Sequence, residues 1–229
     1  MVLEACGVEK WFYRGKGSSN RFFAVRMADL KLEPGRVTGL TGRSGSGKTT
    51  LMNMLAGLLT PDGGRVLLDE KDLYAQDDPS LSALRNRHFG MIPQGGELFP
   101  HLTVMENILL PRGILKSKKE SGRQEEEYVK ELMEQMDILP LSSVPAGELS
   151  GGERRRVCIA RALAGKPEFI FADEPTSDLD DGNTRMTLTI LRQAADSGAA
   201  VMIVTHDSEV AEYADTMLRM DGGIIRGTD

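Results

Sequence analysis

The apolar residues of this chain follow two patterns that predict different elements. Residues 169–172 and 199–205 are continuous apolar runs, which are typical of strands buried on both faces of a parallel sheet. Residues 36–41 predict another short strand. The segment after it repeats at helical spacing, with apolar side chains at Leu51, Met54, Leu55 and Leu58. Strands that alternate with helices predict an α/β fold on a parallel sheet.

The remaining segments depart from this alternation. Residues 2–35 read as strands and turns, with a polar loop at 15–20, and a turn at 60–64 precedes a strand at 65–69. Residues 116–140 predict a helical insert that starts with a charged run at 116–120. Within it, apolar residues recur at helical spacing at Val129, Leu132, Met133 and Met136. Residues 217–225 predict a terminal hairpin.

A glycine-rich loop separates the strand at 36–41 from the next helix. It consists of Gly42, Arg43, Ser44, Gly45, Ser46, Gly47, Lys48 and Thr49, followed by Thr50. Such a loop turns its backbone N–H groups inward, and the helix start adds partial positive charge, so it suits phosphate. Lys48 is expected to reach the β- and γ-phosphates of a nucleoside triphosphate, and Thr49 to give its hydroxyl to Mg²⁺. The flanking strand and helix favour this site over a simple turn.

Two adjacent carboxylates follow the apolar run at 169–172. Asp173 and Glu174 therefore end a strand predicted to be buried, at the edge where parallel sheets bind ligands. An Asp at this edge can hold Mg²⁺, and a Glu beside it can polarise the water that attacks the γ-phosphate. The loop at 42–49 makes this interpretation stronger than a pair of surface acids.

Two further side chains end predicted strands. His206 follows the run at 199–205, where its imidazole can hydrogen-bond a γ-phosphate. Gln94 ends the short apolar segment at 91–93, where its amide can touch both Mg²⁺ and water. A structural His and a surface Gln are the ordinary alternatives, and the surrounding motifs favour the functional roles.

A second glycine motif precedes a helix with Val157, Ala160 and Leu163 on its apolar side. It reads Leu149, Ser150, Gly151, Gly152 and Glu153, and a serine with two glycines at a helix start is an anion-binding end. Arg154, Arg155 and Arg156 crowd the same first turn, which the helix dipole disfavours. Phosphate or acidic groups opposite would explain them, and a solvated basic face is an equal alternative for Arg154 and Arg155.

Composition indicates an ordinary globular protein. The 229 residues carry a net charge of −6, which does not favour a general nucleic-acid binder. Two cysteines, Cys6 and Cys158, fit a reducing cytoplasm and are expected to be small buried side chains. The longest clean apolar run is too short to span a bilayer, so work at a membrane would need another chain.

These motifs together resemble an ATP-binding subunit of an ABC transporter along essentially the whole chain. Residues 42–49 resemble Walker A, Gln94 the Q-loop and residues 149–153 the family signature. Asp173 resembles the Walker B aspartate, Glu174 the catalytic glutamate and His206 the switch histidine. Residues 177–180, which include Asp180, resemble the D-loop.

The resemblance implies a fold, a dimer and partners. The fold would be an α/β P-loop NTPase (RecA-like) core with an N-terminal antiparallel β subdomain and an inserted α-helical subdomain. Two subunits would form a head-to-tail ATP sandwich, with Ser150, Gly151, Gly152, Glu153 and Asp180 acting in trans. Integral membrane permease subunits would dock near the segment after Gln94. An N-terminal aromatic residue would stack on adenine, with Phe12 preferred and Tyr13 or Trp11 as alternatives.

The implied division of the single ABC ATPase domain (1–229) is threefold. Residues 1–35 and 60–75 form mainly the β subdomain, residues 36–59, 85–94 and 165–229 the nucleotide-binding core, and residues 95–164 mainly the helical subdomain. Residues 149–163 and 172–176 resemble the group that serves lipoprotein release, macrolide and antimicrobial-peptide export and a cell-division complex. An importer ATPase and a soluble ATPase of iron–sulfur assembly remain the alternatives. We expect a peripheral protein of the cytoplasmic membrane face.

Overall fold

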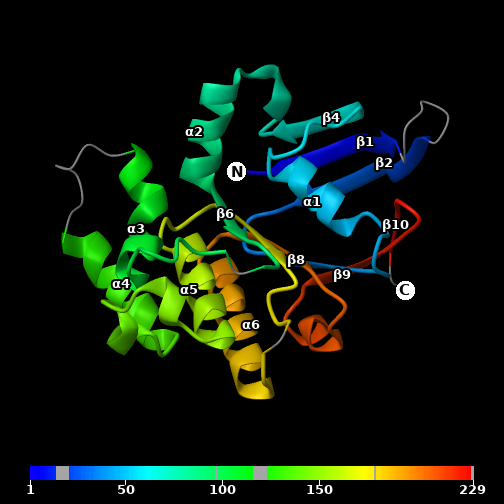
Figure 1. The fold of residues 1–229 in the computed structure, drawn as a ribbon. Helices are drawn as coiled ribbons and strands as arrows, with labels where there is room; N and C mark the ends of the chain where they lie inside the picture. The colour runs from blue at the N-terminus through cyan, green and yellow to red at the C-terminus, as the bar shows by residue number, and fades with distance from the viewer. Residues whose placement is uncertain (14–20, 96, 116–122, 178, 228–229) are drawn as a thin grey trace.

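Two β-sheets and six α-helices make up the described part of the chain (Figure 1). The computed structural model describes residues 1–13, 21–95, 97–115, 123–177 and 179–227, with side chains described outside 112–125. The predictions for residues 15–20, the charged run 116–120 and Asp178 lie outside the described residues.

The larger sheet has six strands in the order β10-β9-β3-β8-β7-β6. Its parallel strands are β3 (Val37–Thr41), β6 (Phe89–Ile92), β7 (Phe169–Asp173), β8 (Ala200–Val204) and β9 (Thr216–Asp221). The last strand, β10 (Ile224–Gly227), pairs antiparallel with β9. The two buried strands and the terminal hairpin predicted from the sequence are confirmed.

The side chains of β7 explain why its apolar run is continuous. Phe169 and Phe171 belong to the hydrophobic core on one face of the sheet, and Ile170 and Ala172 to the core on the other. Successive side chains of a strand point to opposite faces, so a strand covered on both sides must be apolar at every position.

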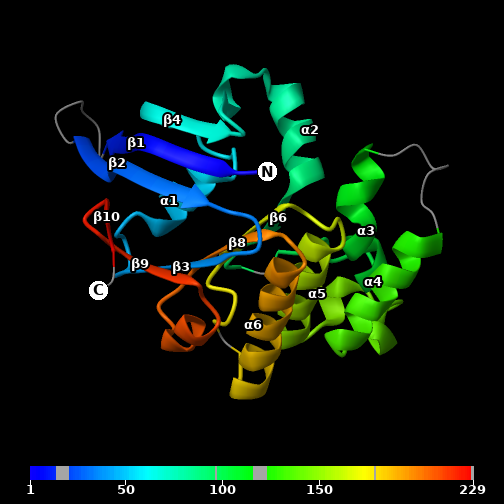
Figure 2. The same ribbon diagram turned by 180° about the vertical axis from the view of Figure 1, so that it is seen from behind.

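The smaller sheet is antiparallel, in the order β2-β1-β4-β5. It contains β1 (Leu3–Tyr13), β2 (Arg21–Leu32), β4 (Gly63–Leu68) and β5 (Lys71–Asp72). Helix α1 (Lys48–Leu55) packs against β1, β2 and β8, and thus lies between the two sheets (Figures 1 and 2).

The other helices are α2 (Asp78–His88), α3 (Val104–Leu115), α4 (Arg123–Gln135), α5 (Gly151–Leu163) and α6 (Asp181–Asp196). Figure 2 shows α5 and α6 on the face of the large sheet opposite the small sheet, with α3 and α4 beside them. The predicted apolar face of α4 is confirmed, because Val129, Leu132, Met133 and the following Met136 are all buried. The residue boundaries proposed for the three subdomains stay a prediction.

Three details differ from the sequence prediction. Helix α1 ends at Leu55, and Leu58, which the periodic pattern included, is 54% exposed. Gly57 adopts a φ of 69°, so the chain leaves the helical path there. Cys158 is buried as predicted, but Cys6 is exposed, so the prediction was wrong for Cys6.

None of the helices in the described ranges has the length and apolar character that a bilayer crossing requires.

Candidate functional site

The glycine-rich loop runs from the end of β3 to the start of α1, as predicted. Gly42, Gly45 and Gly47 have φ values of 151°, 77° and 106°, in the region that favours glycine. A Cβ atom at Gly47 would lie 2.0 Å from the carbonyl oxygen of Ala24, and one at Gly42 would lie 2.2 Å from that of Met220. The loop can therefore take this shape only with glycine at both positions.

Lys48 reaches back over the loop from the first turn of α1. Its Nζ atom donates to the carbonyl oxygens of Gly42 at 2.8 Å and Arg43 at 3.2 Å. The residue is 8% exposed, so its ammonium group sits within the loop instead of in bulk water. Ser46 is also buried, and its hydroxyl oxygen has no hydrogen-bond partner among the described residues. The loop thus holds a cation and an unpartnered hydroxyl at its centre.

The carboxyl end of β7 lies beside this loop. The hydroxyl of Thr49 donates to Asp173 Oδ2 at 2.8 Å, although the two residues are far apart in sequence. Asp173 is 5% exposed, and this burial raises the pKa of its carboxyl group against the lowering effect of the hydrogen bond from Thr49. Two of the three predicted Mg²⁺ ligands, Thr49 and Asp173, are therefore adjacent.

Glu174 and His206 form an ion pair at the same edge. Glu174 Oε2 lies 2.9 Å from His206 Nδ1, and the same oxygen lies 3.4 Å from the His206 backbone nitrogen. The hydrogen bond from the imidazole to Glu174 raises the pKa of His206. The Glu174 side chain is 12% exposed and that of His206 is 77% exposed, so the imidazole covers the carboxylate from the solvent side.

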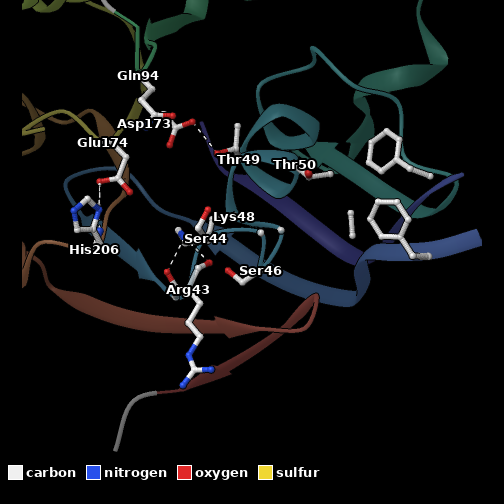
Figure 3. A pocket seen from close by; sticks show the side chains of 16 residues that line it. Arg43, Ser44, Ser46, Lys48, Thr49, Thr50, Gln94, Asp173, Glu174 and His206 are labelled. Carbon is white, nitrogen blue, oxygen red and sulfur yellow. Dashed lines mark hydrogen bonds and ion pairs between the residues drawn. The ribbon is translucent and has the colours of Figure 1, made fainter. Parts of the chain in front are cut away.

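These groups line one cavity of about 520 Å³ (Figure 3). Figure 3 shows Gln94 beside Asp173, while the Arg43 side chain extends away from the other labelled residues. The structure thus brings the predicted loop, strand-end and switch residues together. The predicted residues that line the cavity are Phe12, Gly42, Arg43, Ser44, Gly45, Ser46, Gly47, Lys48, Thr49, Thr50, Gln94, Asp173, Glu174 and His206.

Two phenylalanines form the aromatic end of the cavity. Phe12 lines it, as predicted, and so does Phe22, its cross-strand partner on β2, whose ring centroid is 6.0 Å away. Trp11 instead packs against Arg21, 3.8 Å from its guanidinium carbon, and Tyr13 is 57% exposed. Neither of these two lines the cavity. Phe22 was not predicted, although pairing the aromatic residues at 11–13 with those at 22–23 as a hairpin would have indicated it.

The second glycine motif lies outside this cavity. Ser150, Gly151, Gly152 and Glu153 begin α5, where Ser150 is the N-cap, and the Ser150 N–H and hydroxyl both donate to Glu153 Oε2 at 2.7 Å. The bonds from Ser150 hold the pKa of Glu153 below its ordinary value. Asp180 is the N-cap of α6 and also lies away from the cavity.

Arg155 was predicted to face phosphate or acidic groups, or to belong to a solvated basic face, and the solvated alternative is wrong. The residue is 5% exposed, and its guanidinium donates to five backbone carbonyl groups of described residues at the ends of β6 and β7. Helical periodicity could not show this, because Arg155 occupies a polar position beside an apolar stripe. Arg154 is exposed.

Comparison with known proteins identifies the class. A family model described as "ABC transporter" matches residues 25–177, more than half of the chain. The "Lipoprotein-releasing system ATP-binding protein LolD" of Syntrophotalea carbinolica is 35% identical over 227 residues, which cover 99% of this chain and 97% of that protein. The "Macrolide export ATP-binding/permease protein MacB 2" of Aeromonas hydrophila is 34% identical over 98% of this chain, which spans 34% of that longer protein.

Solved structures agree with this result. The "Dimeric Structure of MJ0796, a Bacterial ABC Transporter Cassette" has a TM-score of 0.89 at 29% identity and covers 98% of this chain and 96% of its own. A post-hydrolysis state of the same cassette, bound to ADP and Pi, has a TM-score of 0.88 at 28% identity, covering 98% of both chains. The chain therefore belongs to the ABC transporter family. It is an ATPase of the ATP-binding cassette class, and the predicted fold class is confirmed.

Proposed function

We propose that this chain binds and hydrolyses ATP as the motor subunit of an exporter or mechanotransmission complex, on the cytoplasmic face of a membrane. The observation that carries the proposal is the contact between Thr49 and Asp173, because it joins the glycine loop to the strand end that bears Glu174. The lipoprotein-release and macrolide-export names of its relatives support the exporter-type assignment over an importer.

The glycine loop fits the triphosphate of ATP. The Lys48 ammonium donates hydrogen bonds to two loop carbonyls, and phosphate oxygens are stronger partners for a cation. The buried Ser46 hydroxyl offers a further donor. Phe12 and Phe22 at the far end of the cavity would hold the adenine ring by stacking.

The strand end fits Mg²⁺. The Thr49 hydroxyl, the Asp173 carboxylate and the Gln94 amide all supply oxygen, which this hard cation prefers. Mg²⁺ held by these residues would offset the negative charge of the phosphates. Because Asp173 is buried, a nearby cation would also stabilise its ionised form.

Glu174 is the proposed general base. Its carboxylate points into the cavity from the turn after β7, beside Asp173, where it can orient a water toward the γ-phosphate. His206 holds that carboxylate from the solvent side and would also hydrogen-bond the γ-phosphate when it is present. Movement of His206 between these partners would link Glu174 to the state of the nucleotide.

Dimer closure would complete the site. The anion-binding start of α5, with Ser150, Gly151, Gly152 and Glu153, lies away from its own cavity, as does Asp180. A head-to-tail homodimer would place these groups of one subunit over the ATP of the other. The dimeric cassettes of the same fold support this arrangement.

A groove on another face is the proposed docking site for a cytoplasmic helix of a membrane permease. This groove between α2, α3 and α5 has a volume of about 680 Å³, and we call it the α2–α5 groove. Phe99 and Leu58 are more than half exposed there. Three arginines, Arg85, Arg87 and Arg161, also line it, which favours a helix with acidic residues. The chain reaches Phe99 five residues after Gln94, so a helix seated here would be coupled to the ATP site.

Light scattering after size-exclusion chromatography tests the ATPase proposal with Glu174→Gln. This variant should bind ATP yet hydrolyse it at least about 100-fold more slowly, because the base is lost. It should therefore run as a dimer with ATP and Mg²⁺ and as a monomer without them. Hydrolysis at the wild-type rate would refute the role of Glu174.

The permease proposal is tested with Phe99→Glu on an affinity-tagged chain. The wild-type chain should co-purify in mild detergent with an integral membrane protein. Adding that membrane protein in nanodiscs should change the ATPase rate of the wild-type chain. Phe99→Glu should lose both effects while keeping basal ATPase activity. Ile224→Glu is the matched control, because Ile224 is an exposed apolar residue on β10, away from the groove. Equal behaviour of the two variants would exclude the groove as the docking site.

A further inference from the structure

We propose that Arg155 is a positioning residue that locks the start of α5 to Gln94 and to Glu174 within one subunit. The inference rests on the ATPase function proposed above. Arg155 lies five residues after Ser150, in the second turn of the helix whose first residues would contact the partner's nucleotide. Its side chain runs in the other direction, toward the cavity of its own subunit.

Five backbone carbonyl oxygens from the described part of the chain accept hydrogen bonds from the guanidinium group. Arg155 Nη1 donates to the carbonyls of Pro93 at 2.5 Å and Gln94 at 2.8 Å. Nε donates to Pro175 at 3.1 Å, while Nη2 donates to Asp173 at 3.1 Å and also to Glu174. One side chain thus joins α5 to the two segments that follow β6 and β7.

The chemistry of this contact requires a guanidinium. Its planar fork offers five N–H donors in fixed directions, so it can bind carbonyls from two segments at once. A buried charge without such partners would be strongly unfavourable. Lysine keeps the charge but has one nitrogen, which cannot reach both sets of carbonyls with the same geometry.

Through the Glu174 carbonyl group, Arg155 positions the backbone of the proposed general base. Glu174 has a φ of 49°, an uncommon conformation for a residue other than glycine. Arg155 and the Ser177 hydroxyl both donate to its carbonyl oxygen, and its own N–H donates to the carbonyl of Val204 at 2.8 Å. These bonds fix the peptide that directs the Glu174 carboxylate into the cavity.

The contact also links two sites that would act on different nucleotides. A shift of Gln94 with a docked permease helix would pull on Arg155 and so on the start of α5, which serves the partner's ATP. The same shift would disturb Glu174, which serves the subunit's own ATP. Arg155 therefore favours concerted movement of Glu174, which serves the subunit's own ATP, and the start of α5, which serves the partner's ATP.

Steady-state ATPase assays on Arg155→Lys and Arg155→Gln test the proposal, with Arg185→Gln as a control that removes the same charge from an exposed position on α6. Both Arg155 variants should lower kcat by about 10- to 100-fold, as expected when a catalytic group is displaced by a fraction of an ångström to an ångström. The affinity of the monomer for a fluorescent ATP analogue should stay within about twofold, because the glycine loop is untouched.

A second readout separates positioning from folding. In a Glu174→Gln background, Arg155→Lys should need a higher ATP concentration for dimerisation than the background alone, while its nucleotide affinity as a monomer is unchanged. A wild-type kcat in both Arg155 variants would overturn the proposal. So would an Arg155→Lys protein that fails to fold, since the residue would then be structural. If the wild-type protein itself hydrolyses no ATP, the proposed function fails instead.

Discussion

Lys48 and Ser46 show how a few residues can prepare a site for a highly charged ligand. Both are buried, and the loop around them is bent into a shape that requires glycine at positions 42 and 47. Burial of a cation and of a hydroxyl without a hydrogen-bond partner among the described residues is unfavourable for folding, and binding of phosphate would satisfy both groups. The loop is organised for binding more than for stability.

Replacing Lys48 tests this interpretation. Lys48→Ala should weaken ATP binding by about 10- to 100-fold, because a charged hydrogen-bond donor to phosphate contributes roughly 1.5–3 kcal/mol. Thermal stability should change little or increase, since the buried charge is removed. Isothermal titration with ATP and thermal unfolding without nucleotide measure the two effects.

Lys31→Ala is the matched control, because the Lys31 side chain is 51% exposed on the small sheet. It removes the same charge without touching the cavity. Equal ATP affinity of wild type, Lys48→Ala and Lys31→Ala would contradict the proposed role of Lys48.

At this scale the sequence predicted residues with a chemical signature and missed those defined by packing. Asp173 and Glu174 could be selected because two carboxylates directly follow four apolar residues. Arg155 could not, since a buried arginine that binds carbonyls has the same local pattern as a solvated one. Phe22 becomes visible only when β1 and β2 are paired, because its neighbour Phe12 is distant in sequence but opposite in register.

At the scale of elements, periodicity predicted the buried strands and α4 but missed α2. In α2 only Leu81 is buried, so no apolar stripe marks the helix. A local signal marks its start instead, because the Asp77 side chain caps the first turn by accepting from the Ser80 N–H at 3.0 Å. Leu58 caused the opposite error. Its apolar side chain fits the helical spacing of α1, so the predicted helix was one turn too long, although Leu58 is exposed.

One carboxylate contributes to the junction of β3, β9 and α6. Asp215, just before β9, accepts from the Val37 N–H at the start of β3 and from Arg192 Nη1 on α6, both at 2.7 Å. The Val37 N–H and the Arg192 guanidinium hold the pKa of Asp215 below its ordinary value. One ionised side chain therefore connects two strands of the large sheet to a helix that covers it.

This contact predicts an acid-dependent loss of stability. Because the folded-state pKa is the lower one, the contribution is fully present above the unfolded-state pKa and is lost as the pH falls through the folded-state value. Asp215→Asn should lower the free energy of unfolding by about 1–2 kcal/mol at pH 7. The difference between wild type and variant should shrink below about pH 4.

Urea unfolding at a series of pH values measures the difference. Asp196→Asn serves as the control, because Asp196 also pairs with Arg192 but its side chain is 64% exposed, so its loss should have little effect. A difference for Asp215→Asn that is independent of pH would show that the stabilisation does not come from its charge.

At the scale of the whole molecule, the two glycine motifs lie apart in one subunit, and only a second copy could bring them together over one nucleotide. The cavity is lined by the first motif, while the second caps a helix outside it. The isolated subunit should therefore bind ATP readily and hydrolyse it slowly, with a specific activity that rises with protein concentration as dimers form.

A mixing experiment tests whether the second motif acts in trans. Ser150→Arg should block closure, because a bulky cation replaces a small N-cap. Lys48→Ala should bind ATP poorly. Each variant alone should therefore hydrolyse ATP slowly. In a mixed dimer, the intact glycine loop of the Ser150→Arg subunit faces the intact Ser150 of the Lys48→Ala subunit. One complete site is then restored, and the ATPase rate of the mixture should exceed the sum of the separate rates several-fold.

A rate equal to that sum would mean that both motifs serve the same subunit's nucleotide, or that closure requires two bound ATP molecules. Repeating the experiment with Glu174→Gln in place of Lys48→Ala separates these outcomes, because that subunit still binds ATP and still offers Ser150.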